Sequence, residues 1–189
     1  MTFTPVPPHL SSVYPENLYP DSDGKPMSEN TLQYRWIVRL VSNLKRLFQG
    51  QNVFVAGDLL WYPVQVQAPP VPAQAPDVMV VKGRPDGYRG SYKQWEEENI
   101  APQVVFEILS PSNTAREMVE KQSFYGKYGV LEMFFYDPAA FSFWGLVRSA
   151  ATENFSPLMP LNLPWVSPCL GIRFRSEEHT SELQSPYVI

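Results

Sequence analysis

The sequence predicts a single α/β domain in which helices flank a mixed central β-sheet. Two short apolar runs, at 78–81 and 103–109, are rich in β-branched residues and are typical of strands buried on both faces. Two longer segments, at 28–48 and 114–127, show the residue spacing of amphipathic helices. At 189 residues and 44% hydrophobic, the chain is long enough for one well-filled core.

The N-terminal part of the chain is expected to form an extended arm followed by a long helix. Residues 1–26 hold six prolines and form the proline-rich arm. The helix at 28–48 has Ser28 as its expected N-cap and ends before Gly50. Its expected apolar stripe is Leu32, Trp36, Leu40, Leu44 and Leu47. Its basic residues are expected on the solvated face, with contact to phosphate as the alternative: Arg35, Arg39, Lys45 and Arg46.

The next segments predict short strands and a proline-rich loop. Residues 53–57 and 59–64 are expected to form two strands, or one strand bent at Gly57 and Asp58. At such a bend Asp58 is interpreted as a turn residue rather than a metal ligand. The segment 65–76 then forms a loop that leads into the strand at 78–81.

A long insertion, residues 82–102, joins the two apolar runs. It interleaves basic with aromatic side chains, which could contact phosphates and stack on bases, or could belong to a packed surface loop. These residues are Arg84, Tyr88, Arg89, Tyr92, Lys93 and Trp95. After the second helix, further strands are expected at 131–136, 141–147 and 170–174.

Glu107 is the anomaly of the pattern, because it lies inside the apolar run 103–109. A buried, ionised carboxylate costs several kcal/mol unless a cation or hydrogen-bond donors meet it. Lys121 lies close to the core-facing stripe of the second helix and is expected to meet this acid. Asp77, at the start of the other run, supplies a second carboxylate if the two strands are neighbours. Two acids and one lysine predict a divalent-metal site with a cation beside it.

Five sequence blocks, taken in order, resemble a known family. They are APDV at 75–78, VFEILSPS at 105–112, Lys121 followed by Tyr125, YGV at 128–130, and YDP at 136–138. Their order and spacing are similar to those of the "putative restriction endonuclease" family that is abundant in cyanobacteria, a branch of the PD-(D/E)XK nuclease superfamily. The resemblance implies a restriction-endonuclease-like core over residues 27–174.

The resemblance also implies an activity and a cofactor. The chain is expected to be a metal-dependent endonuclease that hydrolyses DNA phosphodiester bonds with Mg²⁺ or Mn²⁺. Asp77 and Glu107 would be catalytic metal ligands, and the backbone carbonyl of Ile108 would be a third ligand. DNA is the implied partner, and a homodimer is an open option because restriction-type enzymes often cut as dimers.

Two further catalytic residues come from the same resemblance. The superfamily's lysine is expected two residues after the second acid, where this chain has Leu109. Lys121, on the following helix, matches the position that supplies the lysine in this branch. Glu29 is the candidate for a glutamate on the first helix, although a carboxylate in a first turn is also favoured by the helix dipole alone.

Two other functions remain open from the sequence. The domain could be an inactive binding or assembly module, in which Glu107 and Lys121 form a buried salt bridge. It could also be a glycoside hydrolase that uses paired carboxylates without a metal or the lysine.

Composition excludes several classes of protein. Cys169 is the only cysteine, so no internal disulfide can form, and His9 is the only histidine before residue 175, which disfavours histidine-based catalysis. No signal peptide or membrane span is recognisable, and a cytoplasmic location is expected. The net charge of −4 argues against a broad electrostatic grip on nucleic acid. Residues 175–189 resemble the translation of a sequencing-library adapter and are expected to be non-native, so the natural C-terminus would be missing.

Overall fold

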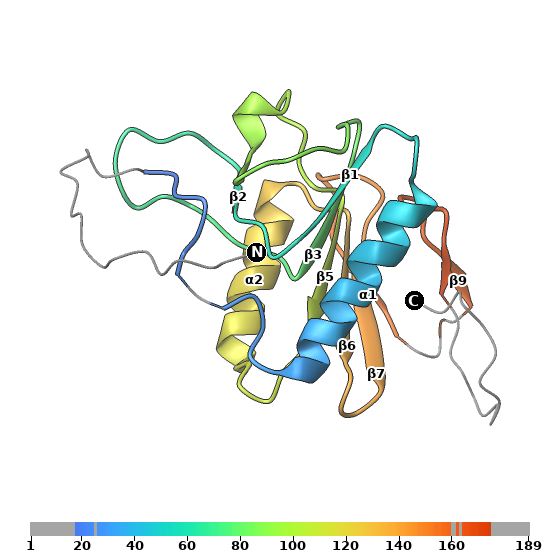
Figure 1. The fold of residues 1–189 in the computed structure, drawn as a ribbon. Helices are drawn as coiled ribbons and strands as arrows, with labels where there is room; N and C mark the ends of the chain where they lie inside the picture. The colour runs from blue at the N-terminus through green and yellow to red at the C-terminus, as the bar shows by residue number, and fades with distance from the viewer. Residues whose placement is uncertain (1–17, 25, 160–161, 163, 175–189) are drawn as a thin grey trace, which may run out of the picture.

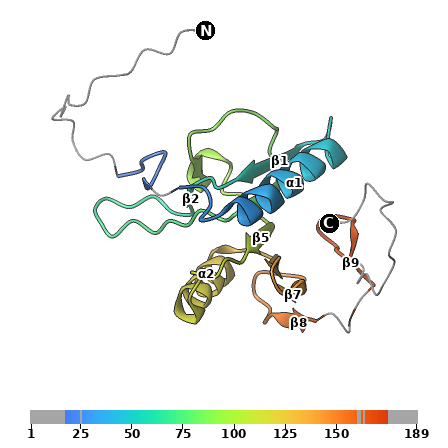
Figure 2. The same cartoon turned by 60° about the horizontal axis from the view of Figure 1, so that its bottom comes forward.

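A six-stranded mixed sheet lies between two helices in the computed structural model, which describes residues 18–24, 26–159, 162 and 164–174 (Figures 1 and 2). Helix α1 (Thr31–Leu47) packs on one face of the sheet, and helix α2 (Ala115–Tyr128) packs on the other. The expected α/β fold class is therefore confirmed. The expected tail at 175–189 and most of the expected N-terminal arm lie outside the described residues.

The main sheet has the order β1-β3-β5-β6-β7-β8. Its strands are β1 (Val53–Gly57), β3 (Val78–Lys82), β5 (Val104–Ile108), β6 (Glu132–Asp137), β7 (Ser142–Val147) and β8 (Ser156–Leu158). Only β5 and β6 pair in parallel, because α2 carries the chain back between them, and the other neighbours are antiparallel. Strand β1 forms one edge of this sheet.

Two small sheets complete the described fold. Strand β2 (Trp61–Tyr62) pairs in parallel with β4 (Tyr92–Lys93), which is followed by the 3₁₀ helix η1 (Gln94–Glu96). Strand β9 (Trp165–Val166) pairs antiparallel with β10 (Arg173–Phe174). The sequence did not predict β4, β8 or β9, because two or three residues are too few to show an alternating pattern.

Side chains of β5 alternate between two separate cores. Val104, Phe106 and Ile108 belong to the core beneath α1. Val105 belongs to the core beneath α2 together with Tyr125 of that helix. Since successive residues of a strand face opposite sides, Glu107 points toward α2.

Helix α1 differs from its expected boundaries and stripe. Its N-cap is Asn30, whose side chain accepts hydrogen bonds from the N–H groups of Leu32 and Gln33 at 3.0 and 2.9 Å, so the expected cap Ser28 is wrong. The buried stripe is Gln33, Ile37, Leu40 and Leu44. Leu32 and Leu47 are exposed. The expected stripe placed Leu32 in the core, but the polar Gln33 occupies that core-facing position. The four basic residues of the helix are exposed, as expected.

Helix α2 agrees with its prediction. The side chain of Thr114 accepts a hydrogen bond from the N–H of Glu117 at 3.2 Å and caps the helix. Gly129 ends it in the left-handed conformation, with φ of 105°. Neither helix of the described part of the chain is long and apolar enough to cross a membrane.

Candidate active site

Asp77 and Glu107 lie opposite each other on neighbouring strands. Asp77 directly precedes β3, which pairs antiparallel with β5 so that Val78 is opposite Phe106. Continued by one residue, this register places Asp77 opposite Glu107. Both side chains are buried, with 8% and 2% of their surface exposed. The sequence predicted that the two acids would lie close together if their strands were neighbours. The structure pairs these two strands.

Asp77 is a buried acid that few donors meet. Its Oδ2 accepts a hydrogen bond of 2.6 Å from the backbone N–H of Ile108. Burial and the nearby Glu107 carboxylate raise the pKa of Asp77 to about 8, although Lys121, the Ile108 N–H and Gln33 act in the opposite direction. Asp77 therefore holds a proton at neutral pH unless additional positive charge reaches it.

Glu107 meets two donors from one face of α2. The ammonium of Lys121 lies 2.6 Å from Oε2, and the hydroxyl of Tyr125 donates to Oε1. Lys121 and Tyr125 are four residues apart, which puts both side chains on the same side of the helix. Burial raises the pKa of Glu107, and these two partners oppose that rise. The sequence identified Lys121, whereas Tyr125 appeared only within a block of the family resemblance and was given no role in the site.

Lys121 keeps its proton in this setting. Burial alone would lower its pKa, but the Glu107 and Asp77 carboxylates outweigh burial and raise it above the ordinary value. Its side chain is 14% exposed, so the ammonium lies between the buried acid and solvent.

Glu29 is connected to the site through other polar groups. It precedes the N-cap of α1 and has no place in the first turn, so the expected helix-dipole role is wrong. The hydroxyl of Ser110 donates to its carboxylate, and its own N–H donates to Gln33 Oε1 at 2.9 Å. Gln33 in turn donates from Nε2 to the carbonyl of Ile108 at 2.9 Å.

Gln33 and Ser110 are site residues that the sequence reasoning missed. Gln33 is 6% exposed and joins α1 to the strand that carries Glu107. The available signal was a glutamine in register with the apolar residues of α1, one turn before Ile37. Ser110 follows the end of β5 and lies in the sequence block that carried the family resemblance.

Asp58 lies beside the two acids. It has a positive φ of 47°, consistent with the turn residue expected there, and its N–H donates to the carbonyl of Asp77 at 3.2 Å. Burial, Asp23 and Glu107 raise its pKa, while Lys121 lowers it. Asp58 therefore adds negative charge at the edge of the site.

The insertion between β3 and β5 is packed more tightly than a flexible loop. Arg84 and Arg89 bind the Glu97 carboxylate at 2.8 and 2.5 Å, and Tyr92 is fully buried. For these residues the packed-loop interpretation holds. Tyr88 is different, since 96% of its side chain is exposed.

The acids at the centre of the site have the chemistry of a hard divalent-cation site. Asp77, Glu107 and the carbonyl of Ile108 offer only oxygen ligands, which suit Mg²⁺ and Mn²⁺. These two buried acids lie near one ammonium, and burial, followed by the Glu107 carboxylate, raises the pKa of Asp77. Among the described residues, no group of three or more His, Cys, Asp or Glu side chains could hold a metal. Mg²⁺ commonly uses one or two carboxylates and completes its shell with water and substrate phosphate.

Comparison with known proteins was made on sequence and on structure. The family model described as "Uma2: Putative restriction endonuclease" matches residues 22–164. Among solved structures, the chain is similar to a "putative nuclease belonging to DUF820" from Anabaena variabilis ATCC 29413, with a TM-score of 0.54 and 15% identity over 79% of this chain and 81% of that chain. At this identity the likeness bears on the fold alone. No curated protein matches the chain.

Proposed function

Because the chain belongs to the Uma2 family, described as "Putative restriction endonuclease", we propose that it is a metal-dependent endonuclease that hydrolyses DNA phosphodiester bonds. The observation that supports this most is the placement of Asp77 opposite Glu107, with Lys121 2.6 Å from the second acid. An acid pair with an adjacent ammonium can hold a divalent cation and stabilise a phosphoryl group that gains negative charge.

In this proposal the chain's own groups have separate roles. Asp77, Glu107 and the Ile108 carbonyl would hold Mg²⁺ or Mn²⁺. When bound, the ion supplies positive charge to the phosphoryl group and lowers the pKa of water. Lys121, which keeps its proton, stabilises developing negative charge on the phosphate or orients the attacking water. Tyr125 holds the Glu107 carboxylate in position by its hydrogen bond.

The hydrogen-bond path from α1 fixes the third oxygen ligand. Gln33 donates to the Ile108 carbonyl, and that oxygen retains a second lone pair for a cation. Glu29 is linked to the same glutamine through its backbone N–H. In this arrangement Glu29 and Gln33 act as positioning residues for the strand end that carries the acids.

Thermal unfolding tests the metal site, and DNA cleavage tests the activity. The full chain and its Asp77→Asn variant are compared with and without Mg²⁺ or Mn²⁺, with Glu120→Gln as the control for losing an exposed acid. We expect a metal-dependent rise in the midpoint for the parent and the control, and none for Asp77→Asn. Metal-dependent cleavage of plasmid DNA should follow the same pattern. If Asp77→Asn cleaved DNA as well as the parent, the proposal would be wrong.

A second candidate function is an inactive binding or assembly module. The observation that favours it is that Glu107 has both oxygens met by the protein's own Lys121 and Tyr125. This candidate predicts no metal-dependent rise in the midpoint and no cleavage, together with a large loss of stability in Glu107→Ala.

A further inference from the structure

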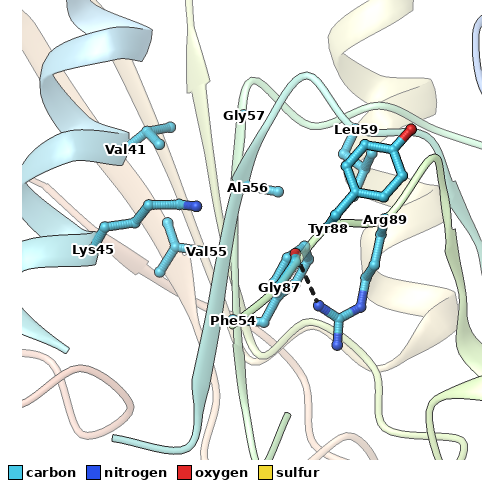
Figure 3. Close-up of a pocket in the computed structure, with 10 residues that line it drawn as sticks. All are labelled: Val41, Lys45, Phe54, Val55, Ala56, Gly57, Leu59, Gly87, Tyr88 and Arg89. Atoms are coloured by element: carbon cyan, nitrogen blue, oxygen red, sulfur yellow. Dashed lines mark hydrogen bonds between the residues drawn. The ribbon is translucent and has the colours of Figure 1, made fainter. Parts of the chain in front are cut away.

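A groove runs along the free edge of β1 (Figure 3). This edge groove has a volume of about 300 Å³ and lies between α1, β1 and the start of the packed insertion. Its lining residues are Val41, Lys45, Phe54, Val55, Ala56, Gly57, Leu59, Gly87, Tyr88 and Arg89. In the close-up, Lys45 lies on one side of the strand, and Tyr88 and Arg89 lie on the other.

The edge groove ends beside the candidate active site. Its lining includes Gly57, the last residue of β1. The next residue, Asp58, donates its N–H to the carbonyl of Asp77 at 3.2 Å. A polymer lying in the groove would therefore lead toward the two acids.

The backbone of β1 offers hydrogen-bonding groups to the groove. Asn52 accepts from the N–H of Gly83 at 2.8 Å, and Asp58 donates to the Asp77 carbonyl, so the even-numbered residues bond toward β3. The N–H and C=O groups of Val55 and Gly57 must then point away from β3. Val55 is only 1% exposed, so of these two residues Gly57 is the one whose backbone can reach the groove. No other strand of the described residues pairs with that side of β1.

Two basic side chains line the groove, Lys45 of α1 and Arg89 of the insertion. Helix α1 contains four basic residues and no acidic residue, and all four are exposed. Lys45 faces the groove. Among the described residues its one ion-pair partner is Asp86, at 3.4 Å, and the two side chains are 45% and 58% exposed. An exposed pair of this kind is weak and exchanges readily for another anion. Arg89 is already committed, because it binds Glu97 and lies 4.0 Å over the ring of Phe54.

Tyr88 presents an open aromatic face at the rim. Arg89 donates to the carbonyls of Pro85 and Gly87, at 3.2 and 3.4 Å, and so fixes the backbone on the N-terminal side of the tyrosine. The ring itself is 96% exposed. A cationic groove with an exposed aromatic ring is the combination by which proteins bind single-stranded nucleic acid, since phosphates meet the cation and a base stacks on the ring.

We propose that the edge groove binds a segment of single-stranded nucleic acid whose backbone leads to Asp77. Lys45 meets a phosphate in exchange for Asp86, the outward N–H of Gly57 donates to the nucleic-acid strand, and Tyr88 stacks on a base. This proposal rests on the proposed function, because it supplies the path by which a phosphodiester reaches the acids.

Binding is measured by titrating the full chain into a fluorescently labelled oligo-dT of twelve nucleotides and following its anisotropy. The buffer contains EDTA and little salt, so that neither metal binding nor cleavage contributes. Lys45→Gln should weaken binding at least threefold and reduce the slope of log K against log salt by about 0.7. The matched control is Lys127→Gln, which removes the same charge from an exposed site on α2 and should change Kd by less than twofold. Asp86→Asn should tighten binding, because it frees Lys45.

The stacking step is tested at Tyr88. Tyr88→Ala should weaken binding about fivefold or more, and Tyr88→Phe should bind as the parent does, because the ring is kept. Equal losses for Lys45→Gln and Lys127→Gln, or full binding by Tyr88→Ala, would overturn the proposal. Tighter binding of a twelve-base-pair duplex through the same two residues would also overturn it. If single-stranded DNA binds as described but no metal supports cleavage, the binding role of the groove is supported and the proposed endonuclease activity is wrong.

Discussion

At the scale of single residues, Asp77 is an acid whose ionised form the protein alone does not balance. Its pKa is raised from 3.8 to about 8, chiefly by burial and then by Glu107. The folded chain therefore holds a proton that the unfolded chain releases above pH 4. Stability from this group falls as pH rises between about 4 and 8, by up to about 1.4 kcal/mol per pH unit.

The first prediction is that Asp77→Asn stabilises the metal-free protein. The amide cannot ionise, so the variant escapes the loss between pH 4 and 8, and its midpoint should exceed the parent's by several degrees at pH 7.5. Thermal unfolding across that pH range in EDTA measures the difference. A midpoint gap that does not grow with pH would contradict the assigned protonation of Asp77.

The second prediction concerns the pair formed by Glu107 and Lys121. Lys121→Met leaves a buried carboxylate with Tyr125 as its remaining side-chain donor, and should lower the free energy of unfolding by about 3 kcal/mol. Adding Glu107→Gln to that variant removes the unmatched charge and should recover much of the loss. A double-mutant cycle in urea gives the coupling energy, and strictly additive losses would show that the two groups do not interact.

At the scale of elements, the start of α1 rests on one side chain. Asn30 accepts two backbone N–H groups there, and the expected cap Ser28 accepts none in the described residues. The third prediction is that Asn30→Ala costs about 1 kcal/mol, because it leaves helix N–H groups without an acceptor. Ser28→Ala is the matched control and should stay within about 0.5 kcal/mol. Urea denaturation compares them, and equal losses would place the cap elsewhere.

The elements that could be predicted are those with a long or dense pattern. The segment 103–109 is dense in apolar and β-branched residues, and α2 has a threonine cap at its start, so both were found from the sequence. The buried stripe of α1 was misjudged because one of its members is Gln33. A glutamine satisfied by a distant carbonyl cannot be distinguished from a surface glutamine by periodicity, since its partner at Ile108 is 75 residues away.

A second buried acid shows what sequence patterning leaves open. Glu132 is 1% exposed at the start of β6, where it accepts from the hydroxyl of Ser167 and from the N–H of Cys169 at 3.0 Å. These two partners are neutral donors of one turn, so the acid anchors that turn against the sheet. The sequence drew attention to Glu107 and not to Glu132, because only Glu107 had a lysine on a predictable helix nearby. A buried acid therefore indicates a metal site only when a charged residue lies beside it.

At the scale of the whole molecule, the central sheet separates two apolar cores, and residues of both cores contact the site. Ile108 belongs to the core beneath α1, and Tyr125 belongs to the core beneath α2. Asp77 accepts a hydrogen bond from the N–H of Ile108, and Glu107 accepts one from the hydroxyl of Tyr125. Since both helices contribute to the same acid pair, the site depends on the whole sandwich, and short motifs alone could not give its geometry.

The fourth prediction concerns where the folded domain ends. Phe174 is 3% exposed, and its ring centroid lies 4.7 Å from that of Phe134, 5.4 Å from that of Phe143 and 5.9 Å from that of Trp165. Phe174→Ala should therefore lower the free energy of unfolding by about 3 kcal/mol or more, through lost contacts and the cavity that remains. Deleting residues 175–189, the segment that resembles an adapter translation, should change it by less than about 0.5 kcal/mol. Urea denaturation of the two variants and the parent decides the point. A deletion that costs as much as Phe174→Ala would mean that the segment belongs to the fold, and that the sequence-based interpretation of it is wrong.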